Sequence, residues 1–213
     1  MADPPSEERD DYHHGDLERS LIRAGRSLVE EGGPDALTLR AAARRSGVSH
    51  AAPYRHFEDR EALLAAVAEE GFAEFRDALT EAARAEHLPG DRVRAMGEAY
   101  VAFGRSRPGL FRLMFGPAVA DKCRHPALQK QARAAYRVIE EGVARAVADN
   151  GTDPSVATMS VWALVHGLAS LFLDGQGPPE LDTEPEALTR AVTEWFATAV
   201  TERPGGNDQT EAS

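Results

Sequence analysis

Apolar residues recur at intervals of three and four along most of the chain, and the strict alternation that marks a surface strand is missing. In residues 16–31, for example, Leu17, Leu21, Ala24 and Leu28 fall on one helical stripe. Gly and Pro residues separate such stretches. The pattern predicts an all-α protein of about nine helices. We expect them near residues 16–31, 38–45, 49–57, 59–86, 91–105, 107–115, 125–150, 154–174 and 185–201.

The two ends of the chain lack this periodicity. Residues 1–12 and 203–213 are polar, acidic and bear Pro or Gly, so we expect both to be disordered tails. The longest predicted helix, 59–86, would span roughly 40 Å. Because it is longer than a small three-helix headpiece needs, we expect it to connect a first domain, 13–60, to a second domain, 61–202.

Composition limits the partners and the compartment. The chain of 213 residues has 35 Asp and Glu against 24 Lys and Arg, a net charge of −11, which excludes a uniformly cationic nucleic-acid binder. The single cysteine, Cys123, cannot form an intrachain disulfide, and the acidic N-terminal residues do not resemble a signal peptide. Polar residues interrupt the apolar stretch 156–173, which favours a buried helix over a membrane span. We therefore expect a cytoplasmic protein.

A local exception to this acidity lies in residues 38–57. The stretch contains Arg40, Arg44, Arg45 and Arg55 but no Asp or Glu. A polyanion such as DNA would suit this surface, and a solvated helix face is the alternative interpretation. Charge alone does not decide between the two.

The same stretch has the pattern of a helix-turn-helix. Thr38 is a suitable N-cap for a short helix, and Gly47 supplies the left-handed residue that a sharp turn needs. Ser49 is a suitable cap for the helix that follows. Two short helices joined by a Gly-containing turn are the elements of this DNA-binding motif.

The outer face of the predicted second helix carries groups that suit DNA. His50 and Arg55 can donate to base edges or phosphates, and Ala51 can contact a thymine methyl group. Tyr54 can reach a phosphate oxygen through its hydroxyl. Pro53 falls in the first turn of this helix, where a missing amide costs little; alternatively, it marks a loop and the helix begins later.

Residues 38–64, TLRAAARRSGVSHAAPYRHFEDREALL, resemble the DNA-binding signature of the TetR family of bacterial transcriptional regulators. The resemblance includes the Y-x-H-F element and a basic residue three positions after the Phe, where family members commonly have Lys. It implies a homodimer with a three-helix headpiece that binds a palindromic operator in double-stranded DNA. It also implies that Thr38, Arg40, Tyr54, His56 and Arg60 face the DNA backbone, and that Ser49, His50, Ala51, Ala52 and Arg55 face the groove.

Two later stretches, 107–116 and 162–171, resemble the C-terminal ligand-binding domain of a TetR subgroup named for its Trp-His-Gly pattern. Trp162, His166 and Gly167 carry that pattern here, and Trp162 and His166 share one helical face because they are four residues apart. His166 has two interpretations: a core residue with its hydrogen bonds satisfied, or a ligand contact.

Most aromatic residues lie in the second predicted domain, where a cavity for an effector would form. We expect a small, mostly apolar effector. The residues we expect to line its pocket are Phe72, Phe103, Phe111, Met114, Phe115, Trp162 and His166.

The last two predicted helices are expected to form the dimer interface. Helix 154–174 is apolar nearly all round, so it needs cover on more than one side, and helix 185–201 has an apolar stripe. Pairing both with their symmetry mates gives a four-helix interface that places two recognition helices roughly 34 to 36 Å apart. The expected interface residues are Val161, Leu188, Val192, Trp195 and Phe196.

The sequence offers no pattern for catalysis or a cofactor. Neither His13 with His14 nor Cys123 with His125 has the further ligands that a metal site needs, and phosphate-binding and nucleophile motifs are missing. We expect no enzyme, no cofactor and no metal. The leading hypothesis is a DNA-binding repressor released by an effector. The alternatives are a regulator controlled by a protein partner, and a helical enzyme or interaction protein whose basic stretch is incidental.

Overall fold

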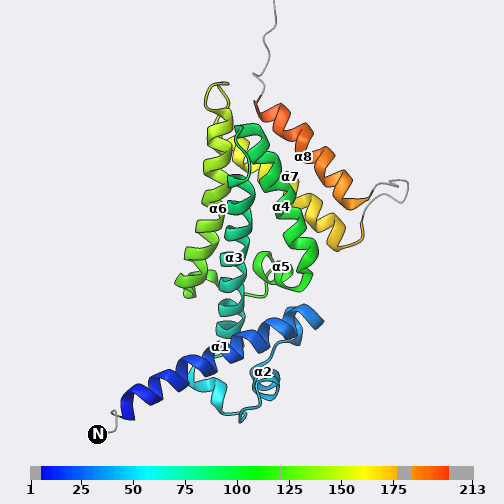
Figure 1. Ribbon diagram of the computed structural model, residues 1–213. Coiled ribbons are helices and arrows are strands. Elements are labelled where there is room, and N and C mark those ends of the chain that lie inside the picture. Colours follow the sequence, from blue (N-terminus) through cyan, green and yellow to red (C-terminus); the bar gives the residue numbers. More distant parts are fainter. Residues whose placement is uncertain (1–5, 120, 177–183, 202–213) are drawn as a thin grey trace, which may run out of the picture. The chain divides into compact units, whose positions relative to one another are not determined.

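The computed structural model describes residues 6–119, 121–176 and 184–201, and every regular element in them is helical (Figure 1). The all-α fold is therefore confirmed. The expected tail 203–213 lies outside the described residues. The α-helices are α1 (Ser6–Gly32), α2 (Leu39–Arg45), α3 (Arg60–Arg84), α4 (Pro89–Ser106), α5 (Pro108–Phe115), α6 (Pro126–Val147), α7 (Pro154–Leu173) and α8 (Pro185–Thr201), and the 3-10 helices are η1 (Pro34–Ala36), η2 (Ala52–Arg55) and η3 (Lys122–Arg124).

Most helices begin where the sequence places a cap or a proline. The Asp59 Oδ1 atom accepts a hydrogen bond from the Ala62 amide at 2.8 Å and caps α3. Asp153 caps α7 in the same way, accepting from the amides of Ser155 and Val156. Such signals act over a few residues, which is why the boundaries could be predicted.

Helix α1 begins at Ser6, earlier than the expected Asp16. Residues 6–12, which we assign from sequence to a tail, belong to this helix. Acidic residues are abundant at its start, and negative charge is stabilised at the N-terminus of a helix. Lack of apolar periodicity therefore did not prevent helix formation there.

The α-helix expected over residues 49–57 is wrong. The chain instead forms the 3-10 helix η2, and Ser49 makes no side-chain cap for it. The amides of Ala52 and His56 donate to the carbonyls three residues earlier, of Ser49 and Pro53. The alternative, that Pro53 marks a loop and the helix begins later, does not hold either, because Pro53 lies within η2, near its start, where a missing amide costs little.

The chain divides into two compact units that interleave in sequence. Unit 1 comprises Met1–Ala73 and Arg107–Ala132, and unit 2 comprises Glu74–Ser106 and Arg133–Ser213. Helices α3 and α6 contribute to both. The predicted DNA-binding domain ends at residue 60, whereas unit 1 also includes α5 and the starts of α3 and α6.

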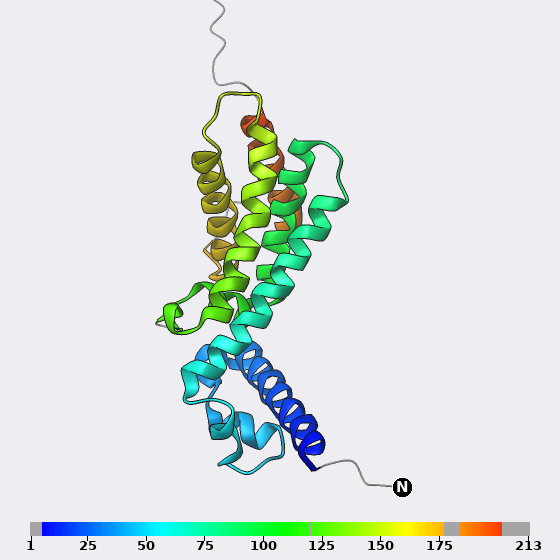
Figure 2. The same ribbon diagram turned by 90° about the vertical axis from the view of Figure 1, so that its left-hand side faces the viewer.

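In unit 1, α1 packs against α2 and α5 (Figure 2). Leu21, Leu37 and Leu63 are fully buried in its core. At the start of α5, a Cβ atom on Gly109 would overlap with the carbonyl oxygen of Val29. Glycine is therefore required for the close approach of α5 to the backbone of α1.

In unit 2, α4 packs against both α7 and α8. In its core the Phe75 ring meets the Tyr100 ring edge to face, with centroids 4.9 Å apart, and it lies tilted against the Phe103 ring at 5.1 Å. These contacts join α3 to α4 and bury large apolar side chains.

Candidate nucleic-acid interface

Helix α2 has the local chemistry that its sequence predicts. Thr38 Oγ1 accepts a hydrogen bond from the Ala41 amide at 3.0 Å, so Thr38 is the N-cap. Gly47, with φ of 70°, provides the left-handed turn after the helix. Between these two ends, Arg40 and Arg44 are exposed. The turn then leads directly into residues 49–57, which we call the recognition segment.

The recognition segment presents most of its predicted contact residues to solvent. Pro53 and Phe57 are buried and anchor the segment, whereas Tyr54 is 59% exposed. Ala52 is half-buried. The exposed residues of the segment are Ser49, His50, Ala51, Tyr54 and Arg55. The structure thus exposes the side chains of the predicted groove-facing set except Ala52.

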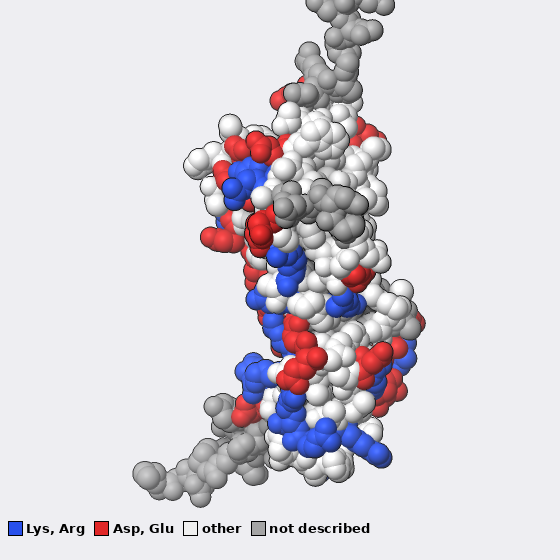
Figure 3. Space-filling view, turned by 90° about the vertical axis from the view of Figure 1, so that its right-hand side faces the viewer, with Lys and Arg blue, Asp and Glu red and all other residues white. Residues whose placement is uncertain are grey.

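The arginines near α2 differ in what they contact. Arg45 forms a two-pronged ion pair with Glu31, donating from Nη1 and Nη2 to the two carboxylate oxygens. The hydrogen bond from Arg45 lowers the pKa of the Glu31 carboxyl, and it raises the pKa of Arg45. Arg40, Arg44 and Arg55 have no ion-pair partner within the described parts of the chain. These three are the cations available to an outside anion, and Lys and Arg side chains gather over this end of unit 1 in Figure 3.

A hollow of about 360 Å³ lies beside α2 and the recognition segment. We call it the α2 hollow. It brings together four of the five residues that the family resemblance places against the DNA backbone. Its lining residues are Thr38, Leu39, Arg40, Tyr54, Glu58, Asp59 and Arg60.

Two carboxylates share this hollow with the cations. Asp59 is committed to the α3 cap, and Arg124 approaches both acids, with its Nη2 atom 3.9 Å from Glu58 Oε2 and 4.0 Å from Asp59 Oδ2. The positive charge of Arg124 at this distance offsets part of the repulsion that the two carboxylates would exert on an incoming anion. The hydroxyls of Thr38 and Tyr54, which carry no charge, complete the polar lining.

Two residues of the predicted backbone-facing set lie differently from that expectation. The His56 side chain is only 8% exposed, and its Nδ1 atom is 3.9 Å from Glu18 Oε2 on α1. The Arg60 guanidinium donates to the backbone carbonyls of Pro34 and Leu37, both at 2.7 Å. His56 is thus placed as a contact within unit 1, because burial limits its access to DNA.

Unit 2 contains a partly buried polar chain, of which the sequence indicates only Trp162 and His166. The Trp162 Nε1–H group donates to the Tyr100 hydroxyl at 3.2 Å, and that hydroxyl lies 2.8 Å from His166 Nδ1. Because an indole can only donate, the Tyr100 hydroxyl accepts from Trp162, and the same hydroxyl joins Trp162 to His166 in one hydrogen-bonded chain. Burial lowers the pKa of His166 and raises the pKa of Tyr100. This arrangement favours the core interpretation of His166.

The predicted effector residues fall into two groups, one in each unit. In unit 1, the Phe115 ring lies 5.4 Å from that of Phe72 and 4.7 Å from that of Phe111. Met114 is fully buried in the same unit, and Phe103, Trp162 and His166 belong to unit 2. Sequence reasoning missed Tyr100, which is 1% exposed, as well as Phe75 and Tyr136. These three residues lie on three different helices, so their positions in the sequence do not indicate which rings they contact.

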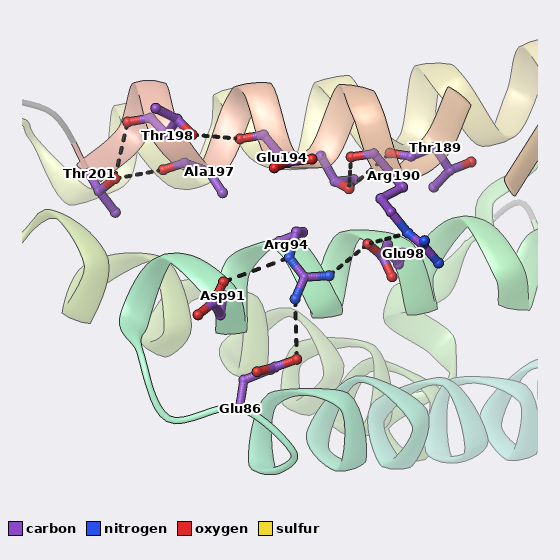
Figure 4. A network of polar contacts seen from close by, with 11 residues as sticks. Glu86, Asp91, Arg94, Glu98, Thr189, Arg190, Glu194, Ala197, Thr198 and Thr201 are labelled. Atoms are coloured by element: carbon purple, nitrogen blue, oxygen red, sulfur yellow. Dashed lines mark hydrogen bonds and ion pairs between the residues drawn. The ribbon is translucent and has the colours of Figure 1, made fainter. Parts of the chain in front are cut away.

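A second network crosses the surface of unit 2 (Figure 4). Arg94 on α4 pairs with Glu86 at 3.2 Å, with Asp91 at 3.8 Å and with Glu98 at 2.9 Å. Glu98 also lies 3.9 Å from Arg190 on α8. The hydrogen bond from Arg94 to Glu98 raises the pKa of Arg94. The spacings of three and four residues on α4 could have indicated the pairs of Arg94 with Asp91 and Glu98 from sequence, but not those that involve Glu86 and Arg190.

This network borders a groove of about 640 Å³ in unit 2. Asp91 and Arg94 line it on one side and Glu194 on the other, and Asn150 at one end donates from Nδ2 to the Val200 carbonyl. Three acids and two arginines line the groove, so it gives no preference for an anionic ligand such as DNA.

Helices α7 and α8 expose large apolar side chains. On α7, Val156, Met159 and Leu171 are 61%, 52% and 43% exposed, and on α8 Trp195 is 69% exposed. Among the described helices, α7 alone is long and apolar enough to cross a membrane, and 28% of its apolar window is buried. Its expected burial is therefore incomplete. Val161, which we place at the dimer interface from sequence, is instead 4% exposed in the core of unit 2.

The other expected interface residues are partly accessible. Leu188, Val192 and Phe196 are half-buried on α8. A helix that is apolar all round does not reveal from its sequence which face turns inward, which explains the placement of Val161. Within the described residues, no group of three or more His, Cys, Asp and Glu side chains could hold a metal ion.

Two family models match the chain in sequence. The model described as bacterial regulatory proteins, tetR family, matches residues 21–67. The model described as tetracyclin repressor-like, C-terminal domain, matches residues 93–196. A comparison with curated proteins gives no match.

Solved structures share the fold. A protein of unknown function from Rhodococcus sp. RHA1 is 34% identical, with 90% of this chain and 98% of that chain covered and a TM-score of 0.77. The TetR family transcriptional regulator PfmR from Thermus thermophilus is 18% identical, with 84% and 97% covered and a TM-score of 0.64. The transcriptional regulator FadR from Bacillus subtilis, solved in complex with stearoyl-CoA, is 12% identical, with 84% and 97% covered and a TM-score of 0.68.

The N-terminal match covers the capped α2, the turn at Gly47 and the recognition segment, and the C-terminal match covers most of unit 2 and α5. The chain therefore belongs to the TetR family of bacterial transcriptional regulators and carries that family's DNA-binding and C-terminal domains.

Proposed function

We propose that the protein represses transcription by binding a palindromic operator as a homodimer, and that a small apolar effector releases it. The observation that carries the DNA-binding role is the α2 hollow, which gathers Thr38, Arg40 and Tyr54 next to the exposed recognition segment. In this proposal Thr38, Arg40 and Tyr54 contact phosphates. The bases are contacted by Ser49, His50, Ala51, Ala52 and Arg55.

The DNA-binding role is tested by selecting duplexes from a randomised pool and measuring the affinity of the selected duplex by fluorescence anisotropy. We expect Arg55→Ala to weaken binding by roughly tenfold or more and to relax the preference at one base pair, because an arginine that donates to a guanine contributes about 1 to 3 kcal/mol. Tyr54→Ala removes a phosphate contact and is expected to weaken binding to all sequences alike.

Arg137→Ala is the matched control, because Arg137 is an exposed arginine of unit 2 without an ion-pair partner among the described residues. It should bind like the wild type. A wild-type protein that enriches no duplex, or an Arg55→Ala variant with unchanged affinity and preference, would contradict the proposal.

The dimer is supported by the exposed apolar side chains of α7 and α8, which need cover in water. A second copy of the chain can provide this cover and also fits a palindromic operator, because a two-fold axis relates the two subunits as well as the two half-sites. In this arrangement Leu188, Val192, Trp195 and Phe196 lie at the interface together with Val156 and Met159. A DNA-binding protein of this kind works in the cytoplasm.

The apolar effector is supported by the aromatic clusters of the two units. One neighbour in fold, FadR, was solved with stearoyl-CoA, a molecule with a long apolar chain. We assign the C-terminal domain to the Trp-His-Gly subgroup on Trp162, His166 and Gly167. A thermal-shift screen with apolar compounds tests the effector: a hit must raise the melting temperature and also release the selected duplex. A screen whose hits never release DNA favours control by a protein partner.

A further inference from the structure

The guanidinium of Arg60 is engaged by the backbone ahead of α2. Arg60 is the first residue of α3, and its Nε atom donates to the Leu37 carbonyl at 2.7 Å. Its Nη2 atom donates to the Pro34 carbonyl at 2.7 Å and to Asp35 Oδ1 at 3.3 Å. The Arg60 side chain thus holds both ends of the short turn 34–37, although Arg60 lies more than twenty residues later in the chain. We call these contacts the Arg60 clamp.

The Arg60 clamp uses N–H groups that a two-pronged phosphate contact would need. A guanidinium has five N–H groups, and a two-pronged grip on phosphate uses either the Nε and Nη2 edge or the Nη1 and Nη2 edge. Both edges include Nη2, which already donates to the Pro34 carbonyl and to Asp35 Oδ1. Arg60 therefore cannot take a phosphate in two-pronged geometry while the clamp is in place.

The clamped turn ends directly before the DNA-contacting end of α2. Leu37 is fully buried, and the next residue, Thr38, is the α2 cap and lines the α2 hollow. Arg40 follows in the first turn of α2. Fixing the carbonyls of Pro34 and Leu37 to α3 fixes where the Thr38 hydroxyl and the Arg40 side chain stand in relation to Tyr54 across the hollow.

We propose that Arg60 is a positioning residue for DNA binding, which holds Thr38 and Arg40 in place through the turn 34–37, and not the phosphate contact that the family resemblance implies. This inference rests on the proposed function. Lysine could not replace Arg60 in this role, because a single ammonium group does not present two parallel donors to two carbonyls. A phosphate contact, by contrast, would tolerate the exchange.

The test compares Arg60→Lys with Arg23→Lys, an exchange at an exposed position of α1 whose side chain has no ion-pair partner among the described residues. Affinity for the selected duplex is measured over a range of salt concentrations. Amide hydrogen exchange is measured on the free proteins at Ala36, Leu37 and Ala41, whose amides are hydrogen-bonded in and beside the turn.

We expect Arg60→Lys to lower the affinity roughly tenfold, because Thr38 and Arg40 are then no longer held in place and must be ordered on binding. The slope of affinity against salt stays the same, since both residues still reach the phosphates. Exchange at the three amides should become faster. Arg23→Lys should change neither. Arg60→Gln should weaken binding to a similar extent, again without reducing the salt slope, since no phosphate contact is lost.

Three results would overturn the inference. The first is an Arg60→Lys variant that binds like the wild type, and the second is an Arg60→Lys variant that binds more weakly but has unchanged amide exchange at the turn. The third is an Arg60→Gln variant whose slope of affinity against salt is smaller by about one, which marks a lost phosphate contact. Wild-type protein that enriches no duplex overturns the proposed function itself, a result distinct from these three because they all require a wild type that binds.

Discussion

At the scale of single residues, the surroundings of His166 favour its neutral form. Its Nδ1 atom is hydrogen-bonded to the Tyr100 hydroxyl, and burial lowers its pKa from the ordinary value of 6.5. The folded protein therefore resists protonating His166, whereas the unfolded chain takes up that proton as the pH falls through about 6.5. Below that pH the unfolded state binds more protons, so acid favours unfolding.

We accordingly expect the free energy of unfolding, measured with urea, to decrease as the pH falls from 7 towards 5. His166→Asn keeps an acceptor near the Tyr100 hydroxyl but does not titrate, so its decrease over this range should be smaller. Equal pH dependence in the two proteins would show that His166 does not contribute to it.

How far the sequence predicts such features depends on how local they are. The Thr38 cap and the Gly47 turn each involve neighbours within a few residues and were predicted correctly. The Arg60 clamp and the pair of Tyr100 with His166 join residues far apart in the chain, so no spacing rule indicates them. Pro53 marks an intermediate case, because its missing amide permits either a helix start or a 3-10 turn.

At the scale of elements, the contact of α5 with α1 depends on a residue without a side chain. A Cβ atom on Gly109 would meet the backbone of Val29, which cannot move without displacing α1. A Cβ atom on Gly71 of α3 would instead lie 2.8 Å from Met114 Sδ and 2.9 Å from Leu110 Cδ1, which are the ends of flexible side chains.

Gly109→Ala should therefore lower the free energy of unfolding by roughly 1 to 3 kcal/mol or more, although Ala is the better helix former. Gly71→Ala, its control, should cost less because side chains can adjust. Urea unfolding of the two variants measures the difference. If Gly109→Ala is as stable as the wild type, α5 does not approach α1 as closely as the structure indicates.

At the scale of the whole molecule, the proposed dimer rests on the exposed apolar surface of α7 and α8. The sequence predicted that these two helices would need a partner, since α7 is apolar nearly all round. It could not predict that Val161 faces inward while Met159 and Trp195 face solvent, because only packing against α4 decides which side is buried.

We expect the purified protein to be a dimer at micromolar concentration and Trp195→Glu to shift it towards monomer, because a charge would be buried at the interface. Sedimentation equilibrium measures this. Leu88→Glu is the control: Leu88 is 65% exposed in the turn before α4, outside both helices. A monomeric wild type, or a Trp195→Glu variant as dimeric as the control, would refute this interface.

The most direct test of the central claim is a footprint of the full-length protein on DNA that flanks its own gene, at physiological salt. We predict a two-fold symmetric protected site whose half-sites lie about one helical turn, roughly 34 to 36 Å, apart, and its loss in Arg55→Ala while the dimer persists. Protection without symmetry, or an undiminished footprint in Arg55→Ala, would contradict it.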